Sequence, residues 1–332
     1  MNDVAARAGV SLKSVSRVVN GEAGVSVDLA RRVGEAVREL GYRHNLTASN
    51  LRRGHRTKSI GMLVQDLSNE YCSAILRAVE DRARERGVVV MAASIDEDAG
   101  RQRELVEGLV ARRIDGLILM PTGNDLSWLE VDVASGLVVV SIDRRPLLPA
   151  MDAVVADNQG DAAEAVGQLL AHGHRRIAII GDSPAISTAV ERRDGYRAAL
   201  RAAQLTPDPA LERLGVRTRD EAVTTAVELL HLPDPPTAIF AARNVICEGV
   251  IIALQRHRRV HDVALIGFDE VAVAEMVEPQ ISVVSQNTYA IGRRAIDLLL
   301  SRLDGDDSPA RVDIVSSTLV RRGSGEIRGP GR

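Results

Sequence analysis

DVAARAGVSLKSVSRVVN, residues 3–20, predicts two short helices joined by a tight turn. Ala5 is small enough to let the helices approach closely, and Gly9 can adopt the left-handed conformation that the turn needs. Val15, a β-branched residue on the second helix, fills the gap between them. Ser11 stands where its hydroxyl can cap the second helix. The pattern is typical of a helix-turn-helix, although an Ala/Val-rich hairpin that serves packing alone shares it.

The second helix is expected to have one apolar and one polar side. Val15, Val18 and Val19 should point inward. The exposed side carries hydroxyl groups and long cationic side chains, which can reach base edges in a DNA major groove. We therefore expect the following residues to contact DNA: Ser11, Leu12, Lys13, Ser14, Ser16, Arg17 and Asn20.

A third helix follows and leads into a basic segment. Ser26 and Asp28 mark the start of that helix, and Gly41 ends it. Residues 42–59, YRHNLTASNLRRGHRTKS, then contain few apolar side chains and several arginines. This segment is either a simple linker or a piece that becomes ordered on DNA.

The charge of the chain is divided unevenly. The net charge over 332 residues is −3, but residues 1–58 hold 11 Lys and Arg against 5 Asp and Glu. The remainder holds 31 against 40. A small basic module on an acidic body predicts that the amino-terminal end binds nucleic acid.

Other features of the sequence narrow the class of protein. Cys72 and Cys247 are far apart and lack metal-ligand spacing, so we expect two reduced thiols and no metal site. The chain shows no charged-then-apolar leader and no run of 18 apolar residues. We therefore expect a cytoplasmic protein with no membrane contact.

From Ser59 onward, short apolar runs alternate with amphipathic helices, which indicates parallel sheets built from βαβ units. The expected strands are residues 60–65, 88–93, 116–120, 138–142, 154–156, 176–181, 238–242, 263–267 and 282–285. The expected helices include residues 73–86, 101–112, 161–171, 191–203 and 291–303. Two such series predict two doubly wound lobes.

Polar residues follow many of these strands. In open parallel sheets, ligands bind beyond the carboxyl ends of the strands, so these residues predict a polar cleft. Capping of the next helix is an equally good explanation for Asp143 and Asp182, and a weaker one for Asp269. The residues at the strand ends are Gln65, Asp66, Asp143, Arg144, Asp157, Asp182, Arg243, Asn244, Asp269 and Gln286.

The order and spacing of many short strings resemble the lactose-repressor (LacI/GalR) family of bacterial transcription regulators. Among them are DVAARAGVS, SVSRVVNG, ELGYRHN, ASNL, DGLILMP, GHRRIAIIGD, ERRDGYRAAL, ALIGFDE and LVRRGSG. The resemblance implies an all-α helix-turn-helix headpiece (residues 1–44), a hinge helix and linker (45–58), and a periplasmic-binding-protein-like α/β body (59–323). Its N-lobe would comprise about 59–156 and 288–313, and its C-lobe about 157–287 and 314–323.

The resemblance also implies particular site residues. Asn45, Ala48 and Leu51 match the hinge, in which Ala48 would let two hinge helices pack and Leu51 would enter the minor groove. The residues that match effector contacts of the family are Arg192, Arg243 and Asp269, followed by Tyr71 and Gln286.

This chain departs from the family pattern at one of these positions. Arg243-Asn244 stands where relatives usually carry Asn-Asp, and only seven residues are aromatic. Two guanidinium groups in the cleft would suit an anionic effector through bidentate pairing. In the alternative, Arg243 pairs with Asp269, and Arg192 alone holds the hydroxyl groups of a neutral sugar.

The expected function is that of a sequence-specific transcriptional regulator, a repressor, whose affinity for a near-palindromic operator depends on a sugar-like effector. No cofactor is expected. The glycine-rich tail, residues 324–332, should be disordered and cannot form a helical zipper, so we expect a homodimer. The alternative is a dinucleotide-binding or other small-molecule α/β enzyme fused to a DNA-binding module, although glycine-rich phosphate loops and nucleophile motifs are missing.

Overall fold

A computed structural model describes residues 1–19, 24–42 and 57–330. The chain divides into two compact units, Met1–Thr57 and Lys58–Arg332. We call the first unit the headpiece and the second the body. The expected DNA contact Asn20 and the expected hinge residues Asn45, Ala48 and Leu51 lie outside the described residues.

The headpiece contains the three predicted helices, α1 (Asn2–Ala8), α2 (Leu12–Val19) and α3 (Val27–Glu39). Gly9 ends α1 in the left-handed region with φ of 63°, as the turn requires. The Ser11 hydroxyl accepts a hydrogen bond from the Ser14 amide at 3.1 Å, which confirms the predicted cap. The buried core consists of small and β-branched residues from all three helices: Val4, Ala5, Ala8, Val15, Val33 and Ala36.

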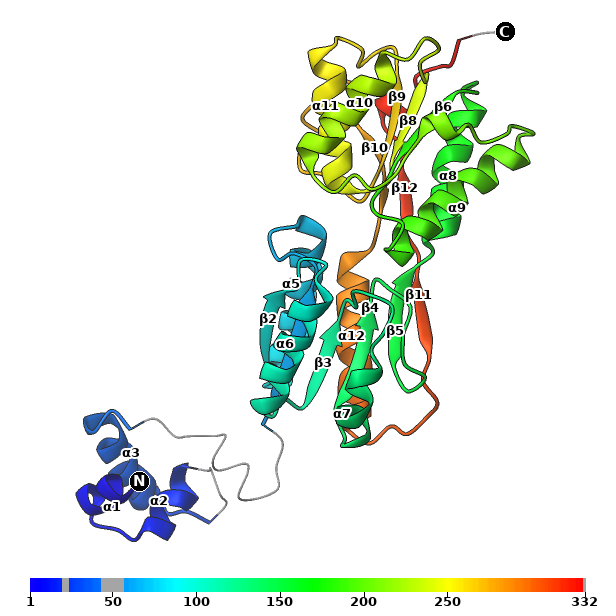
Figure 1. The fold of residues 1–332 in the computed structure, drawn as a ribbon. Coiled ribbons are helices and arrows are strands. Elements are labelled where there is room, and N and C mark those ends of the chain that lie inside the picture. The colour runs from blue at the N-terminus through cyan, green and yellow to red at the C-terminus, as the bar shows by residue number, and fades with distance from the viewer. Residues whose placement is uncertain (20–23, 43–56, 331–332) are drawn as a thin grey trace. The chain divides into compact units, whose positions relative to one another are not determined.

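The body contains two six-stranded sheets (Figure 1). The first has the strand order β11-β5-β4-β3-β1-β2, with β1 (Ser59–Val64), β2 (Val89–Ser94), β3 (Gly116–Leu119), β4 (Val138–Ile142), β5 (Asp152–Ala156) and β11 (Val312–Val315). The second has the order β12-β10-β9-β8-β6-β7, with β6 (Ile177–Ile180), β7 (Glu212–Arg213), β8 (Ala238–Ala241), β9 (Ala264–Phe268), β10 (Ser282–Ser285) and β12 (Thr318–Val320). Strand β12 pairs antiparallel with β10, whereas the other described pairs run parallel.

Helices cover both faces of each sheet. In lobe 1, built on the first sheet, α5 (Glu70–Glu85) and α12 (Thr288–Leu303) pack on one face, and α6 (Ala99–Ala111) and α7 (Glu130–Ala134) on the other. In lobe 2, built on the second sheet, α8 (Asn158–Ala171) and α9 (Ser187–Ala202) cover one face. Helices α10 (Arg219–Leu230) and α11 (Asn244–Arg256) cover the other. This arrangement is the predicted doubly wound architecture.

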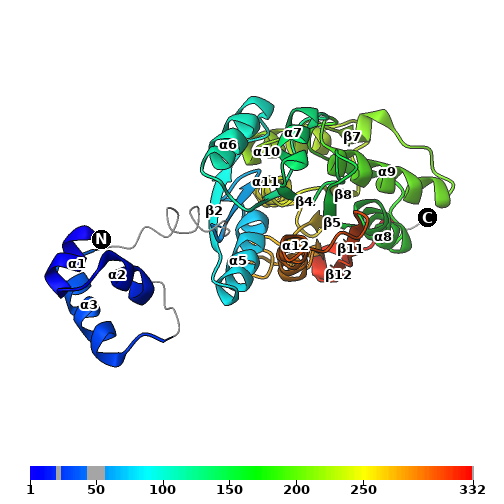
Figure 2. The ribbon, with the colours of Figure 1, turned by 90° about the horizontal axis from the view of Figure 1, so that it is seen from below.

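The chain passes between the lobes three times, after β5, after β10 and after β11. The second passage returns α12 to lobe 1, where it lies beside α5 (Figure 2). Gly292 permits this close approach, because an added Cβ there would lie 2.6 Å from the carbonyl oxygen of Ile75.

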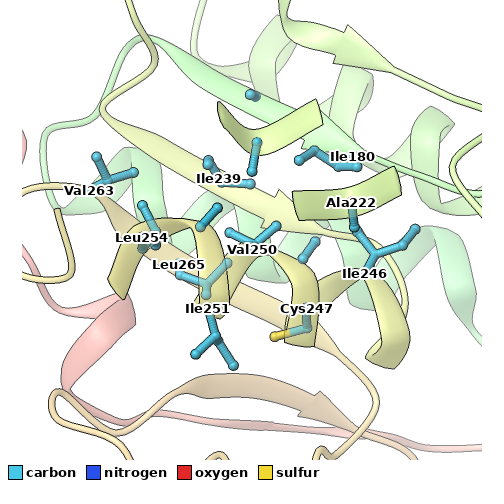
Figure 3. Close-up of a cluster of buried hydrophobic side chains, with 14 of the residues drawn as sticks. Ile180, Ala222, Ile239, Ile246, Cys247, Val250, Ile251, Leu254, Val263 and Leu265 are labelled. Carbon is cyan, nitrogen blue, oxygen red and sulfur yellow. The ribbon is translucent and has the colours of Figure 1, made fainter. Parts of the chain in front are cut away.

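The largest described core lies in lobe 2, between the sheet and helices α10 and α11 (Figure 3). Ile180 and Ile239 project from the sheet toward Val250 and Ile246 of α11, and all four are fully buried. Strands β6, β8 and β9 are buried on both faces, which explains their continuous apolar sequence.

The prediction of a disordered tail is wrong for residues 324–330. Ser324 is buried and donates a hydrogen bond to the carbonyl of Leu265 at 2.6 Å. The ring of His174 donates from Nε2 to the carbonyl of Ile327 at 2.8 Å, and the amide of Gly329 donates to the carbonyl of His172. The tail is therefore held by hydrogen bonds to main-chain carbonyl groups, which a glycine-rich composition does not reveal.

Candidate functional site

A polar cavity, partly open to solvent, lies where the carboxyl ends of strands from both lobes face each other. Lobe 1 contributes Gln65 after β1 and Asp143 after β4. Lobe 2 contributes Asp182 after β6, Arg243 after β8 and Asp269 after β9. The parallel strands thus bring to one place side chains that lie far apart in the sequence.

The predicted effector residues Tyr71, Arg192, Arg243 and Asp269 line this cavity. Gln286 joins the group by donating to Asp269 at 2.6 Å. The Tyr71 hydroxyl donates to Asp143 at 3.0 Å and lies 3.3 Å from the side-chain oxygen of Gln286. Tyr71, Gln286, Asp269 and Arg192 are therefore linked by hydrogen bonds and one long ion pair, whereas Arg243 lines the same cavity without a direct bond to them.

Arg192 is buried and held from several sides. It donates from Nε to the side-chain oxygen of Asn158 and from Nη1 to the carbonyl of Ala242, both at 2.9 Å. Its guanidinium carbon lies 3.7 Å from the centre of the Phe268 ring, a favourable cation–π contact. Asp269 is 3.8 Å away, so that ion pair is long. These contacts fix the guanidinium plane.

Arg243 is paired with Asp182 and Gln65 and not with Asp269. It donates to Asp182 at 2.5 Å and to the side-chain oxygen of Gln65 at 2.9 Å. The alternative in which Arg243 pairs with Asp269 is therefore wrong. Strand β8 lies between β6 and β9, so Arg243 has Asp182 on one side and Asp269 on the other. The local sequence does not determine which of these two carboxylates it binds.

Arg144 is a buried residue of the cavity that was not among the predicted contacts. It forms an ion pair with Glu97 and donates to the carbonyl of Pro121 at 2.6 Å. Its Nε has no hydrogen-bond partner within the described part of the chain. Its position just after a predicted strand places it among the polar strand ends that predict the cleft. Neither Asp143 nor Asp182 caps a helix, because β5 follows Asp143 and the N-cap of α9 is Ile186.

The cavity is balanced in charge. Three guanidinium groups, of Arg144, Arg192 and Arg243, face the carboxylates of Asp143, Asp182 and Asp269. Burial raises the pKa of Asp269 above its usual value, although Arg192 opposes the shift. Burial also raises the pKa of the Tyr71 phenol, and Asp143 adds to that effect. The Tyr71 hydroxyl therefore stays protonated and donates a hydrogen bond at every physiological pH.

The headpiece presents the predicted DNA contacts on α2. Val15 is fully buried, whereas Ser11, Leu12 and Lys13 are exposed. Ser14, Ser16 and Arg17 are half-buried, and Arg17 also donates to the carbonyl of Gly24 at 3.3 Å. The polar side of α2 is therefore accessible.

Residues 1–19, 24–42 and 57–330 hold no group of three His, Cys, Asp or Glu side chains that could bind a metal ion. They also hold no helix that is long and apolar enough to cross a membrane. Both cysteines are free and buried, and burial raises the pKa of Cys72 to about 11 and of Cys247 to about 12. The sequence predicts two reduced thiols, and both cysteines are free in the structure.

Two family models match the chain. Residues 1–45 match the lacI family of bacterial regulatory proteins, and residues 166–325 match the periplasmic binding protein-like domain. The probable HTH-type transcriptional regulator EndR of Paenibacillus polymyxa is 31% identical over 310 residues, covering 92% of this chain and 90% of EndR.

Solved structures agree with these matches. The complex of the transcriptional regulator CelR with cellobiose has a TM-score of 0.74 and 32% identity, covering 97% of this chain and 98% of CelR. The Lac repressor dimer bound to operator has the same fold, with a TM-score of 0.85 at 24% identity and the same coverage. These relatives are regulators and not enzymes. The chain belongs to the LacI family of bacterial regulatory proteins.

Proposed function

We propose that this chain is a cytoplasmic repressor that binds a near-palindromic operator as a homodimer and responds to a small-molecule effector. The observation that carries the proposal is the presence, in one chain, of an accessible helix-turn-helix and a polar cavity formed by both lobes. An effector that binds the two lobes changes the angle between them, and the affinity for DNA then changes by thermodynamic linkage.

We also propose the division of the chain given above: headpiece 1–44, hinge and linker 45–58, and effector domain 59–323. The N-lobe comprises about 59–156 and 288–313, and the C-lobe about 157–287 and 314–323. The two sheets support these boundaries, because β11 belongs to the first sheet and β12 to the second.

The effector that fits this cavity is a neutral polyhydroxylated molecule such as a sugar. An anionic effector needs a guanidinium with unused charge, but Arg243 is paired with Asp182, and Arg144 with Glu97. Arg192 uses Nε and Nη1 on Asn158 and Ala242, and the carboxylate of Asp269 lies 3.8 Å from it. The relative CelR, which was solved with cellobiose, supports the same class of ligand.

We assign a task to four of the five predicted contacts, and also to Asp143 and Arg144. Carboxylates accept hydrogen bonds from hydroxyl groups, so Asp269 and Asp143 bind vicinal hydroxyls of the effector. Arg192 and the unpartnered Nε of Arg144 donate to ring or hydroxyl oxygens. Tyr71 and Gln286 keep the two carboxylates in place. Charged groups thus replace the aromatic rings that are scarce in this chain.

The effector site is tested by calorimetry with ribose, glucose and cellobiose and with their phosphorylated counterparts. We expect a neutral sugar to bind and Asp269→Ala to abolish the binding, whereas the surface control Asp262→Asn retains it. At 100 times its dissociation constant, the bound sugar should stabilise the protein by about 2.7 kcal/mol. Preference for the phosphorylated member would contradict the neutral assignment.

We assign sequence-specific recognition of DNA to α2. Lys13 and Arg17 are long donors that can reach guanine O6 and N7, and a good bidentate contact contributes roughly 1–3 kcal/mol of discrimination. Leu12, 48% exposed, is placed for apolar contact with a base. Ser11, Ser14 and Ser16 supply hydroxyl groups for phosphate or base edges.

The test uses an operator selected from random DNA by the wild-type protein. We expect Arg17→Ala to lose ten-fold or more in affinity for that operator and little for scrambled DNA. Arg31→Ala on α3, whose guanidinium is paired with Asp28 and Glu35, serves as the charge-matched control. Equal loss of affinity on both DNAs would show that Arg17 contacts only the phosphate backbone.

A further inference from the structure

The strand order defines a hinge side and a mouth side of the cleft. The three passages between the lobes follow β5, β10 and β11. In the first sheet β11 and β5 form one edge, and in the second sheet β12 and β10 form the corresponding edge. Strands β1 and β8 lie away from those edges. Side chains that follow β1 and β8 therefore lie toward the mouth side, farther from the passages than the ends of β5 and β10, and opening of the lobes would separate them more.

Four side chains connect the lobes on this side, and we call them the mouth bridge: Gln65, Asn69, Arg243 and Asn244. Arg243 of lobe 2 donates to the side-chain oxygen of Gln65 in lobe 1 at 2.9 Å. The amides of Asn69 and Asn244 exchange two hydrogen bonds, at 3.2 and 3.1 Å. Three hydrogen bonds thus cross the mouth of the cleft.

Further contacts hold three of the four members of the mouth bridge, Arg243, Asn69 and Asn244, in their orientations. Asp182 fixes the Arg243 guanidinium at 2.5 Å. The side-chain oxygen of Asn69 also accepts from the Tyr71 amide at 3.0 Å, and that of Asn244 accepts from the Val245 amide at 2.8 Å. The first of these bonds caps α5, and the second orients Asn244, the first residue of α11, against the next main-chain amide. The bridge is preorganised on each side before the lobes meet.

We propose that the mouth bridge determines specificity by size: it confines the effector to a single sugar ring, enclosed between the bridge and the hinge side. This inference rests on the proposed sugar-binding function. The polar groups that would hold a ring, those of Asp143, Arg192 and Asp269, lie in the same cavity as the bridge. A second ring would project through the mouth and would have to displace at least two of the three bonds. Arg243, which stands where relatives usually carry asparagine, contributes one of these three bonds.

The test compares ribose and glucose with cellobiose by calorimetry on the full-length protein. We expect the wild type to bind one of the monosaccharides at least 100-fold more tightly than cellobiose. The double variant Asn69→Ala/Arg243→Ala should reduce this ratio at least ten-fold. The matched control is Arg145→Ala, which removes another contact between the lobes, the ion pair with Glu191 at 3.4 Å. Arg145→Ala should leave the ratio unchanged.

A second measurement uses spin labels at exposed positions of the two lobes, introduced as Glu107→Cys and Glu228→Cys. We expect a longer or broader distance distribution in the double variant than in the wild type. An unchanged distance distribution would contradict the proposed role of the mouth bridge. Equal affinity of the wild type for glucose and cellobiose would also contradict it. If no sugar binds to either protein, the proposed effector class fails, and the label distances still decide whether the bridge holds the lobes together.

Discussion

The headpiece and the body are both rich in alanine and valine, but they support their functional side chains in different ways. In the headpiece, the helix that carries the expected DNA contacts has one fully buried residue, Val15. In the body, Asp182, Arg243 and Asp269 follow strands that are buried along their whole length. A single fully buried side chain therefore anchors the recognition helix to the small core of the headpiece, whereas in the body the functional side chains are supported by many buried residues.

The largest expected loss of stability lies in the body. Asp152 is 2% exposed and accepts two hydrogen bonds from Arg302 and one from the Arg311 amide. Arg302→Met leaves this carboxylate buried without its cation, which should cost about 3–5 kcal/mol in urea unfolding of the body. The double variant Asp152→Asn/Arg302→Met should recover part of that loss. If the Arg302→Met variant still binds operator, the headpiece folds independently of the stability of the body, as the contrast between the two regions predicts.

A smaller change should be enough to unfold the headpiece. Val15→Ala removes two buried methyl groups and leaves a cavity, at a cost of roughly 2 kcal/mol. Such a loss is a large part of the stability of so small a unit. We expect operator binding to disappear while binding of the effector is retained.

The matched control for this experiment is Val250→Ala, which makes the same chemical change in the fully buried core of lobe 2. That variant should remain folded and should bind both DNA and effector. If Val15→Ala still binds operator at 37 °C with wild-type affinity, the headpiece is more robust than its small core indicates.

Acid should weaken the body through His174. Burial lowers the pKa of this ring, which is inaccessible to solvent and bonded to Thr237 and Ile327. The unfolded chain takes up a proton near the usual pKa of 6.5, while the folded chain resists it. The free energy of unfolding should therefore decrease as the pH falls from 6.5 through the lowered pKa. Unfolding midpoints of His174→Gln should lose this dependence, and those of the exposed control His261→Gln should keep it.

The smallest expected effect is a gain in stability. Gln168 on α8 is buried, and neither its side-chain oxygen nor its nitrogen has a hydrogen-bond partner in residues 57–330. Gln168→Met keeps the length of the side chain and removes the unsatisfied groups, so we expect stabilisation by about 1 kcal/mol. A decrease in the thermal midpoint would mean that this amide is satisfied in solution, for example by water.

The sequence was most informative where one local pattern determines one element. Apolar runs predicted the buried strands, and β10 was placed at its observed residues, 282–285. The predicted helices begin two to four residues later than the observed ones. The true starts follow the capping side chains of Asn69, Asp98, Asp157 and Asn287. Those caps are readable in the sequence.

The partners of the cavity residues could not be predicted in the same way. Polar strand ends predicted a cleft, and motif positions led to Arg192 and Asp269. The pairing of Arg243 with Asp182, and not with Asp269, depends on how β6, β8 and β9 are aligned and on the rotamer of one long side chain. The bonds from Arg243 to Gln65 and between Asn69 and Asn244 link residues about 175 positions apart in the chain, a separation that no local pattern encodes.

The return of α12 to lobe 1 has a consequence for biosynthesis. The core on one face of the first sheet includes Ile291, Ala295, Ile296 and Leu299 of α12, yet β1 of that sheet begins at Ser59. At translation rates of roughly 5–20 residues per second, lobe 1 waits on the order of 10–50 s with this apolar face uncovered. The headpiece can fold early in synthesis, whereas lobe 1 can be completed only after most of lobe 2 has been made. A nascent chain that stalls before Thr288 should therefore depend on chaperones to remain in solution.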